Sequence, residues 1–344
     1  MVIDNNFYMS LALKEAWKYQ GVTYPNPAVG SLILDPNNQI ISIEAHHKAG
    51  TAHAELRAIE KAMIAFGDKR LPTIENATDK YNYIISHHKK RFKDCTIFVT
   101  LEPCNHHGST PPCSVLIKKL GFKKLVCGTN DPNAEASGGI NYLKENNIEV
   151  EKFIMQRECL DLLTPFKLWH QKGQFIFFKI ATNLNGVYNS GTISSPSSFQ
   201  FVHHLREKID LLVIGGDTVR ADRPTLDCRL TNSDKVPDIL IHTKNDNIDR
   251  DIPLFKIKNR KVFIESNFSK LHDYKYIMIE GGEGMFNLTK DFVDWYLIFE
   301  SSKLKKGKNI QANHDLYRLY STNVDIDTMT WYSNSNIKVK KHSL

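Results

Sequence analysis

The sequence predicts an α/β protein built from two domains. A chain of 344 residues exceeds the usual size of one domain, and two domains of roughly 150 to 200 residues are the natural expectation. The apolar fraction of 41%, with 10% aromatic residues, is enough to form real cores and excludes a mostly disordered chain. Helical and strand patterns alternate along the chain, which favours mostly parallel sheets covered by helices on both faces.

The first half contains the clearest alternation. Apolar periodicity and β-branched runs predict helices at residues 11–19, 53–65, 113–120 and 139–146, and strands at residues 29–34, 40–43, 95–100 and 124–128. The first two strands flank the turn sequence DPNN and should pair with each other. Residues 66–92 are polar and basic, and we expect them to form a surface insertion.

The second half repeats the α/β pattern. We expect helices at residues 157–170 and 198–208, a turn at Gly173, and strands at residues 175–181, 211–214, 239–243, 261–265 and 276–279. The boundary should lie near residues 148–172, which gives domains at residues 1–150 and 151–344.

Several classes of protein are excluded by what the sequence lacks. No apolar run approaches the roughly 20 residues of a membrane helix, and the N-terminus does not resemble a secretory signal, so a cytoplasmic protein is expected. Six cysteines are too few for a disulfide scaffold in a chain of this length, and metal binding or catalysis is the first interpretation of their spacing.

The net charge of +7 has three possible meanings. Much of the surplus lies in two late clusters, Lys303, Lys305, Lys306 and Lys308, then Lys338, Lys340 and Lys341. A solvated basic surface, a site for an anionic substrate such as a phosphate, and a nucleic-acid surface would all show this pattern. Charge alone favours the solvated surface.

A candidate zinc site is spread over three segments of the first half. His53 begins a predicted helix, Cys104 follows a strand, and Cys113 begins the next helix. One imidazole and two thiolates leave the fourth zinc position for water, as in catalytic sites, whereas His106 or His107 as a fourth ligand would make the site structural. Glu55 favours catalysis, because a carboxylate beside the zinc ligands can move protons. We also expect helix N-termini at both cysteines to favour thiolates. Packing accounts better for the other cysteines, Cys95, Cys127, Cys159 and Cys228.

The order His-x-Glu, Pro-Cys, Cys is the signature of zinc-dependent nucleobase deaminases, in which hydroxide attacks an amino-bearing ring carbon and ammonia leaves. Nucleoside and RNA deaminases usually have two residues between the cysteines, whereas eight residues separate Cys104 from Cys113. The longer loop has room for a substrate that carries a phosphate.

Longer matches identify a particular family. The segments TYPNPAVG (23–30), LEPCNH (101–106), TPPC (110–113) and DPN (131–133), together with His46 and Gly50, resemble the bacterial bifunctional deaminase/reductase family of riboflavin biosynthesis. The resemblance implies a cytidine-deaminase-like α/β/α domain followed by a dihydrofolate-reductase-like domain. It also implies two reactions on a diaminopyrimidinone ribosyl 5′-phosphate, namely zinc-dependent hydrolytic deamination and then NADPH-dependent reduction of the ribosyl to a ribityl chain.

The resemblance assigns roles in the first domain residue by residue. His53, Cys104 and Cys113 would hold Zn²⁺, and Glu55 would be the proton shuttle. The positions that would contact substrate are Asn26, His46 and His106. A turn residue between two prolines is the alternative for Asn26. Ser109 departs from the family, which often has a basic residue there.

The second domain matches the family at residues 179–186, 205–206, 222–226 and 229. The sequence EGGEG (280–284) follows a strand and opens a helix, so its N–H groups could bind a cofactor phosphate, although a tight turn is the simpler interpretation of this motif alone. By family position, the residues that would line the NADPH site are Ala181, Thr192, Thr218, Asp222, Thr243, Gly282, Glu283, Gly284, Met285, Phe286, Asn287 and Leu288. Those that would face the ribosyl phosphate are Ser190, Arg206, Leu226, Arg229 and Glu280.

Two local departures from the family accompany these matches. The usual SLDG reads NLNG (183–186), with Asn185 at the place of the acid, and residues 187–194 form a shortened segment. For the arginines, a guanidinium suits a phosphate because it donates two parallel hydrogen bonds, whereas a helix-surface or loop charge is the plainer alternative for Arg206 and Arg229.

Four functions therefore compete. The first is the bifunctional enzyme, which we expect to be a homo-oligomer with a small phosphorylated pyrimidine as substrate and neither nucleic acid nor membrane as partner. The second is a deaminase with a reductase-like scaffold. The third is an RNA-acting zinc deaminase, and the fourth is a zinc-stabilised binding module without catalysis. The two-domain organisation disfavours the third, and replacement of Glu55 would separate the fourth from the enzymes.

Overall fold

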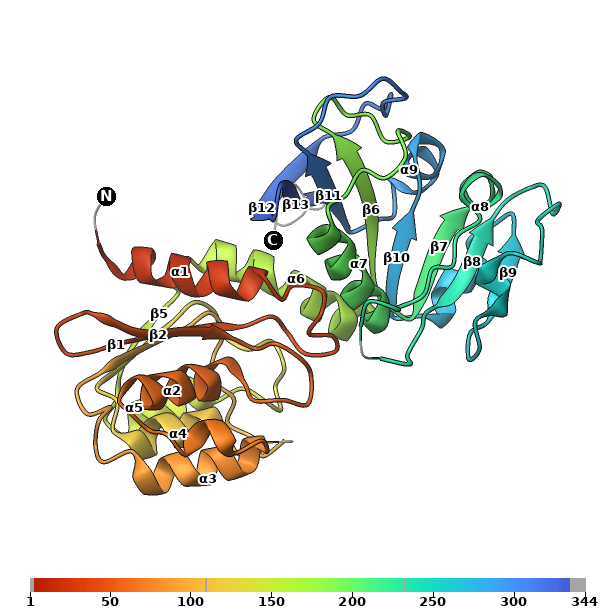
Figure 1. The fold of residues 1–344 in the computed structure, drawn as a ribbon. Helices are drawn as coiled ribbons and strands as arrows, with labels where there is room; N and C mark the ends of the chain where they lie inside the picture. Colours follow the sequence, from red (N-terminus) through yellow and green to blue (C-terminus); the bar gives the residue numbers. More distant parts are fainter. Residues whose placement is uncertain (1–2, 109, 232, 335–344) are drawn as a thin grey trace. The chain divides into compact units, whose positions relative to one another are not determined.

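The computed structural model describes residues 3–108, 110–231 and 233–334, and the chain divides into two compact units, Met1–Lys167 and Leu168–Leu344 (Figure 1). Ser109 and the lysines beyond residue 334 lie outside the described residues. No helix in the described ranges is long and apolar enough to cross a membrane. Whether the two proposed activities divide at residue 150 stays a prediction.

The first unit is built on a five-stranded sheet in the order β2-β1-β3-β4-β5. Its strands are β1 (Gly30–Leu34), β2 (Ile40–Ala45), β3 (Thr96–Val99), β4 (Lys124–Cys127) and β5 (Glu149–Lys152). β1 pairs antiparallel with both β2 and β3, while β3, β4 and β5 are parallel. The prediction of a mostly parallel sheet is wrong for this unit, because β1 pairs antiparallel with both of its neighbours and only two of the four strand pairings are parallel.

Helices cover both faces of this sheet, as predicted. α1 (Asn5–Trp17) lies on one face, and α2 (Ala54–Ala65), α4 (Cys113–Leu120) and α5 (Gly139–Glu145) lie on the other (Figure 1). α1 begins earlier than predicted because the Asp4 side chain accepts a hydrogen bond from the backbone N–H of Phe7 and caps the helix. α6 (Gln156–Lys172) ends just before Gly173, which adopts a left-handed conformation with φ of 72°.

The segment at residues 66–92 is more than a surface insertion, and that prediction is wrong. It contains the short 3₁₀ turn Leu71–Thr73 and the helix α3 (Ala77–His87), which is capped by the Asn76 side chain. Leu71, Ile84 and Phe92 are fully buried. Because only a few apolar residues anchor the segment to α2 and α4, its overall polarity concealed the helix.

The second unit contains an eight-stranded sheet in the order β12-β13-β11-β6-β10-β7-β8-β9. The strands are β6 (Phe175–Asn183), β7 (Leu211–Gly215), β8 (Asp238–His242), β9 (Val262–Glu265), β10 (Tyr276–Glu280), β11 (Trp295–Ser301), β12 (Leu316–Val324) and β13 (Asp327–Asn334). The first five and β11 are parallel, and the hairpin of β12 and β13 joins antiparallel beside β11. The sequence patterns did not predict the last three strands.

Three helices accompany this sheet, namely α7 (Pro196–Lys208), α8 (Gly216–Asp222) and α9 (Glu283–Thr289), with 3₁₀ turns at Pro253–Lys256 and Ser269–Asp273. The mainly aliphatic core contains an aromatic group, in which Phe178, Phe286 and Tyr296 pack with ring centroids 5.6 to 6.2 Å apart. Because β6, β7, β8 and β10 are parallel, their carboxyl ends meet at one edge of the sheet, which is where α/β proteins bind ligands.

Candidate active site

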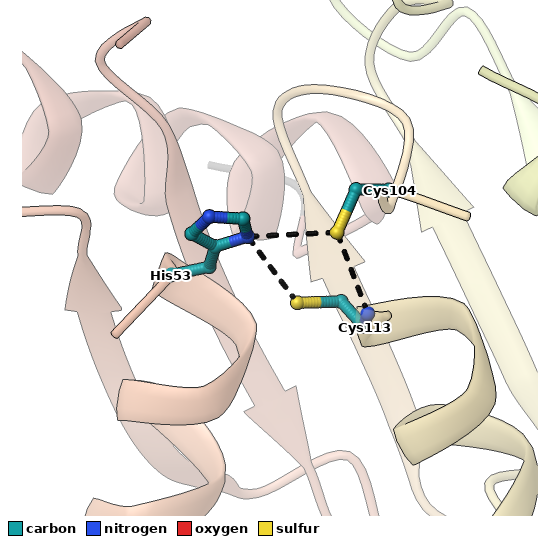
Figure 2. Close-up of side chains that lie close together, drawn as sticks. All are labelled: His53, Cys104 and Cys113. Carbon is teal, nitrogen blue, oxygen red and sulfur yellow. Dashed lines mark hydrogen bonds between the residues drawn. The ribbon is translucent and has the colours of Figure 1, made fainter. Parts of the chain in front are cut away.

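Three side chains from separate elements converge in the first unit (Figure 2). His53 Nδ1 lies 3.5 Å from Cys104 Sγ and 3.6 Å from Cys113 Sγ, and all three ligand atoms lie within 4.8 Å of one another. A tetrahedral zinc ion with Zn–S of about 2.3 Å and Zn–N of about 2.05 Å would place sulfur and nitrogen about 3.6 Å apart. The donor set and its spacing therefore fit zinc.

Local structure explains how each ligand is presented. His53 is the N-cap residue of α2, Cys104 lies in the loop after β3, and Cys113 is the first residue of α4. The expectation that Cys104 lies at the N-terminus of a helix is wrong, because Cys104 lies in a loop. The N-terminus of α4 nevertheless serves it, because the backbone N–H of Cys113 donates to Cys104 Sγ over 3.5 Å. Hydrogen bonding from the Cys113 thiol, together with His53 and this N–H group, lowers the pKa of the Cys104 thiol.

Glu55 lies in the first turn of α2, two residues from the ligand His53, and is only 4% exposed. Burial, and then the negative charge of Cys104, raise the pKa of the Glu55 carboxyl to about 7. A carboxyl group with a pKa near the working pH can both accept and return a proton.

His46 and Asn26 form a rigid pair beside the metal ligand. His46 Nδ1 lies 3.1 Å from the carbonyl oxygen of Ala52, which can only accept, so Nδ1 carries the proton. Burial lowers the pKa of His46 to about 4, and the neutral ring accepts at Nε2 from Asn26 Nδ2 over 3.2 Å. The rings of His46 and His53 meet edge to face with centroids 5.7 Å apart. Asn26 is thus more than a turn residue, because its amide orientation is set next to the zinc site.

The remaining loop residues do not complete a four-ligand site. His106 and His107 are exposed, and within the described ranges the metal-ligand group around His53 contains only the two cysteines besides it. The structural-zinc alternative therefore lacks its fourth protein ligand among the described residues. The other cysteines, Cys95, Cys127, Cys159 and Cys228, are buried as predicted.

The sequence interpretation missed Glu102, which organises the loop around Cys104. Its buried carboxylate accepts three backbone hydrogen bonds, from Asp131 over 3.2 Å, Gly138 over 2.9 Å and Ile140 over 3.1 Å. Gly138, the N-cap residue of α5, has no side chain to cap the helix. The Glu102 carboxylate instead accepts from the free backbone N–H groups at this helix N-terminus. A glutamate two residues before a ligand cysteine was the available signal, but its partners are far along the chain.

In the second unit, Arg206 and Glu280 come together. Arg206 Nη2 donates to both Glu280 oxygens over 3.2 and 3.3 Å, and Lys179 Nζ lies 3.8 Å from Glu280 Oε1. Burial opposes ionisation of Glu280, but the charges of Arg206 and Lys179 lower its pKa below the usual value. Arg206 is 9% exposed, so it is not the helix-surface charge of the plainer interpretation. Its Nε, like Nδ1 of the buried neighbour His203, has no hydrogen-bond partner within the described part of the chain.

The other residues expected to face substrate are less uniform. Leu226 is buried with a left-handed φ of 54°, and Arg260 donates to its carbonyl oxygen over 2.5 Å. Arg229 is exposed and pairs with Asp227 over 2.8 Å. Ser190 Oγ accepts from Asn183 Nδ2 over 2.6 Å.

The residues expected to bind NADPH follow the carboxyl ends of the parallel strands. Ala181 lies on β6, Thr218 and Asp222 follow β7, Thr243 follows β8, and residues 282–288 follow β10. A Cβ on Gly216 would lie 2.6 Å from Thr243 Cβ, and one on Gly281 would lie 2.6 Å from Met285 Cβ, so these segments are closely packed. Met285 and Phe286 point into the core, whereas Thr192, Gly284, Asn287 and Leu288 are exposed.

Comparison with known proteins finds two family models that match separate parts of the chain. Residues 3–129 match the cytidine and deoxycytidylate deaminase zinc-binding region, and residues 175–304 match the RibD C-terminal domain. The riboflavin biosynthesis protein RibD of Aquifex aeolicus is 34% identical over 242 residues, which cover 68% of this chain and 60% of that protein. The chain belongs to the RibD family.

Further RibD proteins and structures extend the likeness. RibD of Actinobacillus pleuropneumoniae is 28% identical over 320 residues, covering 81% of this chain and 78% of that protein. The structure of a diaminohydroxyphosphoribosylaminopyrimidine deaminase/5-amino-6-(5-phosphoribosylamino)uracil reductase from Thermotoga maritima matches with a TM-score of 0.64 and 26% identity, over 96% of this chain and 98% of that chain. RibD of Acinetobacter baumannii, with a TM-score of 0.62 and 22% identity over 96% of this chain and 98% of that chain, shares the fold.

These matches confirm the predicted fold class. The first unit is the cytidine-deaminase-like domain, and the second is the dihydrofolate-reductase-like RibD C-terminal domain. The chain spans about three fifths of the length of the first curated RibD proteins that it matches, which are those of Aquifex aeolicus and Bacillus amyloliquefaciens.

Proposed function

We propose that this protein catalyses two consecutive steps of riboflavin biosynthesis. The first is hydrolytic deamination of a diaminopyrimidinone ribosyl 5′-phosphate, and the second is NADPH-dependent reduction of the ribosyl group to a ribityl chain. The observation that carries the proposal is the His53–Cys104–Cys113 group with buried Glu55 beside it, in a chain that also has a RibD C-terminal domain.

In the deamination step, the protein's own residues bind, orient and move protons. His53, Cys104 and Cys113 would hold zinc, which supplies the Lewis acidity that makes water nucleophilic near neutral pH. Glu55 accepts a proton from the attacking water and returns it to the leaving amino nitrogen, a role that its pKa of about 7 favours. The exchange releases one molecule of ammonia for each water consumed.

Substrate recognition in this unit follows from the fixed pair of Asn26 and His46. Because Asn26 Nδ2 donates to His46, the amide presents its oxygen and its second N–H group in a defined orientation. These groups suit the ring of a pyrimidinone, which carries both donors and acceptors. The exposed side chain of His106 lies in the loop between the two cysteines, where a substrate phosphate would need a partner.

In the reduction step, the second unit would bind NADPH along the carboxyl edge of β6, β7, β8 and β10. The cofactor supplies hydride when it is bound. Arg206 is bonded to Glu280, and its Nε has no partner among the described residues, so we propose it as the group that binds the ribosyl phosphate. We propose Ser190, Leu226 and Arg229 as further contacts of this substrate. The turn at Gly282 would approach the cofactor phosphates through backbone N–H groups.

The test is to incubate the purified zinc-loaded protein with the diaminopyrimidinone ribosyl phosphate, with and without NADPH, and to separate the products by liquid chromatography with mass detection. We expect the deaminated ribosyl compound without NADPH and the ribityl compound with it. Unchanged substrate in both incubations would refute the proposal.

The same experiment decides a second candidate, a deaminase whose second unit only binds phosphate or supports assembly. The observations that favour it are the NLNG turn and the Ser190 hydroxyl, which is engaged by Asn183. Product that stops at the deaminated ribosyl compound, with NADPH unconsumed, would select this candidate. A homo-oligomer and a cytoplasmic location stay predictions, the first testable by sedimentation.

A further inference from the structure

The turn after β6, where NLNG (183–186) replaces the family's SLDG, makes contacts with a distant segment of the chain. We call residues 183–190 the asparagine turn and residues 303–309 the lysine segment. Every residue of the lysine segment is exposed, and its four lysines lie within six residues. The two segments are more than 110 residues apart in the sequence, and hydrogen bonds between them join them side by side.

The side chain of Asn185 is bonded twice to one residue of the lysine segment. Its Nδ2 donates to the carbonyl oxygen of Lys305 over 2.7 Å, and its Oδ1 accepts from the backbone N–H of Lys305 over 3.3 Å. Only an amide can donate and accept in this way, because an ionised carboxylate has no N–H or O–H to donate. The asparagine at the position of the family's acid therefore makes a contact that aspartate could not.

The backbones reinforce this pairing. The N–H of Leu184 donates to the carbonyl of Lys303 over 2.9 Å, and the N–H of Tyr188 donates to the carbonyl of Lys308 over 3.1 Å. The N–H of Lys308 in turn donates to Asn189 Oδ1 over 2.7 Å. A Cβ on Gly307 would lie 2.5 Å from Val187 Cγ1, so the close approach requires glycine there.

The asparagine turn also reaches the segment expected to bind cofactor. A Cβ on Gly282 would lie 2.3 Å from Cε2 of the Tyr188 ring, so this ring packs directly on the glycine turn after β10. Two residues beyond the lysine segment, the backbone N–H of Gln311 donates to Glu283 Oε1 over 3.2 Å at the start of α9. The asparagine turn therefore contacts the EGGEG turn at Gly282, and the residues just after the lysine segment contact it at Glu283.

We propose that Asn185 is a positioning residue of the second unit: its amide clamps the asparagine turn to the lysine segment and thereby holds Tyr188 against Gly282. The consequence for NADPH rests on the proposed reductase function, whereas the clamp itself does not.

Trypsin cleavage tests the clamp without any need for activity. Cleavage after Lys303, Lys305, Lys306 and Lys308 is followed by mass spectrometry in the zinc-loaded full-length protein under native conditions. We expect Asn185→Asp, which loses one hydrogen bond, to accelerate cleavage by about fivefold. Asn185→Ala loses both and should accelerate it by about 25-fold, since each lost hydrogen bond changes a local opening equilibrium by about fivefold. The control is Asn323→Asp, the same change at an exposed residue of β12.

Two outcomes would overturn the proposal. A cleavage rate of Asn185→Ala within twofold of the wild-type rate would show that the Asn185 amide does not hold the lysine segment in place. Equal acceleration by Asn323→Asp would show that the effect comes from charge or global stability.

A second measurement tests positioning. Asn185→Ala should raise the KM for NADPH several-fold. The rate of ammonia release should stay unchanged because the deaminase site lies in the other unit, and the thermal midpoint should stay unchanged because the clamp joins two exposed residues, Asn185 and Lys305. An unchanged KM for NADPH would limit Asn185 to a local structural role and overturn its positioning role. If the unchanged protein consumes no NADPH, the proposed reductase function fails, and the trypsin result still decides the clamp.

Discussion

Glu102 provides a sharp test of how the loop around Cys104 is held in place. In Glu102→Ala, the backbone N–H groups of Asp131, Gly138 and Ile140 lose their acceptor. Hydrogen bonds to a charged group contribute about 1.5 to 3 kcal/mol each, and water can replace some of this for the half-buried donors, so we expect a loss of about 3 to 5 kcal/mol. Glu102→Gln keeps Oε1 as acceptor for Gly138 and Ile140 and should lose only about 1 to 2 kcal/mol.

The assay follows urea unfolding of the zinc-loaded protein by two signals, tryptophan fluorescence and zinc release to a chromophoric chelator. Zinc release reports the first unit selectively, because all three ligands lie there. The matched control is Glu135→Gln, which lies between the donors Asp131 and Gly138 but has an exposed side chain. A loss below 1 kcal/mol in Glu102→Ala, or an equal loss in the control, would refute the role given to Glu102.

Three further predictions concern single residues. Glu55→Gln should retain zinc, measured by metal analysis, yet release no ammonia; release at the unchanged rate would remove Glu55 from the mechanism. Arg206→Ala should raise the KM for the ribosyl phosphate substrate far more than that for NADPH, and equal losses would argue against phosphate binding. Burial lowers the pKa of His203 to about 4, so the folded state disfavours its protonation and stability is lost as pH falls from about 6.5 towards 4. Between pH 7 and 5, the free energy of unfolding of the wild-type protein should fall by about 1 to 2 kcal/mol more than that of His203→Asn. Parallel pH profiles of the two proteins would contradict this.

The elements that sequence patterns predicted well are those with strong local signals. The helix that begins at Cys113 and the strand at residues 276–279 were placed within a residue or two, because capping, helical periodicity and short buried runs act between near neighbours. The helix α3 was missed because its polar surface outweighs the two residues it buries, Tyr81 and Ile84. The residues of the candidate zinc group could be predicted to come together because their chemistry is rare and their order is characteristic.

The sequence by itself determined the α/β class and pointed to the candidate zinc group of His53, Cys104 and Cys113 with Glu55 beside it, since these depend on residue type and local spacing. Tertiary structure alone decided the antiparallel pairing of β1 with β3, the place of β11, β12 and β13, and the partners of Glu102, which lie 29 to 38 residues away. It also decided that Asn185 meets Lys305, 120 residues later. Such contacts depend on chain reversals and strand register that bring distant backbone groups together, and no local pattern encodes the geometry of that meeting.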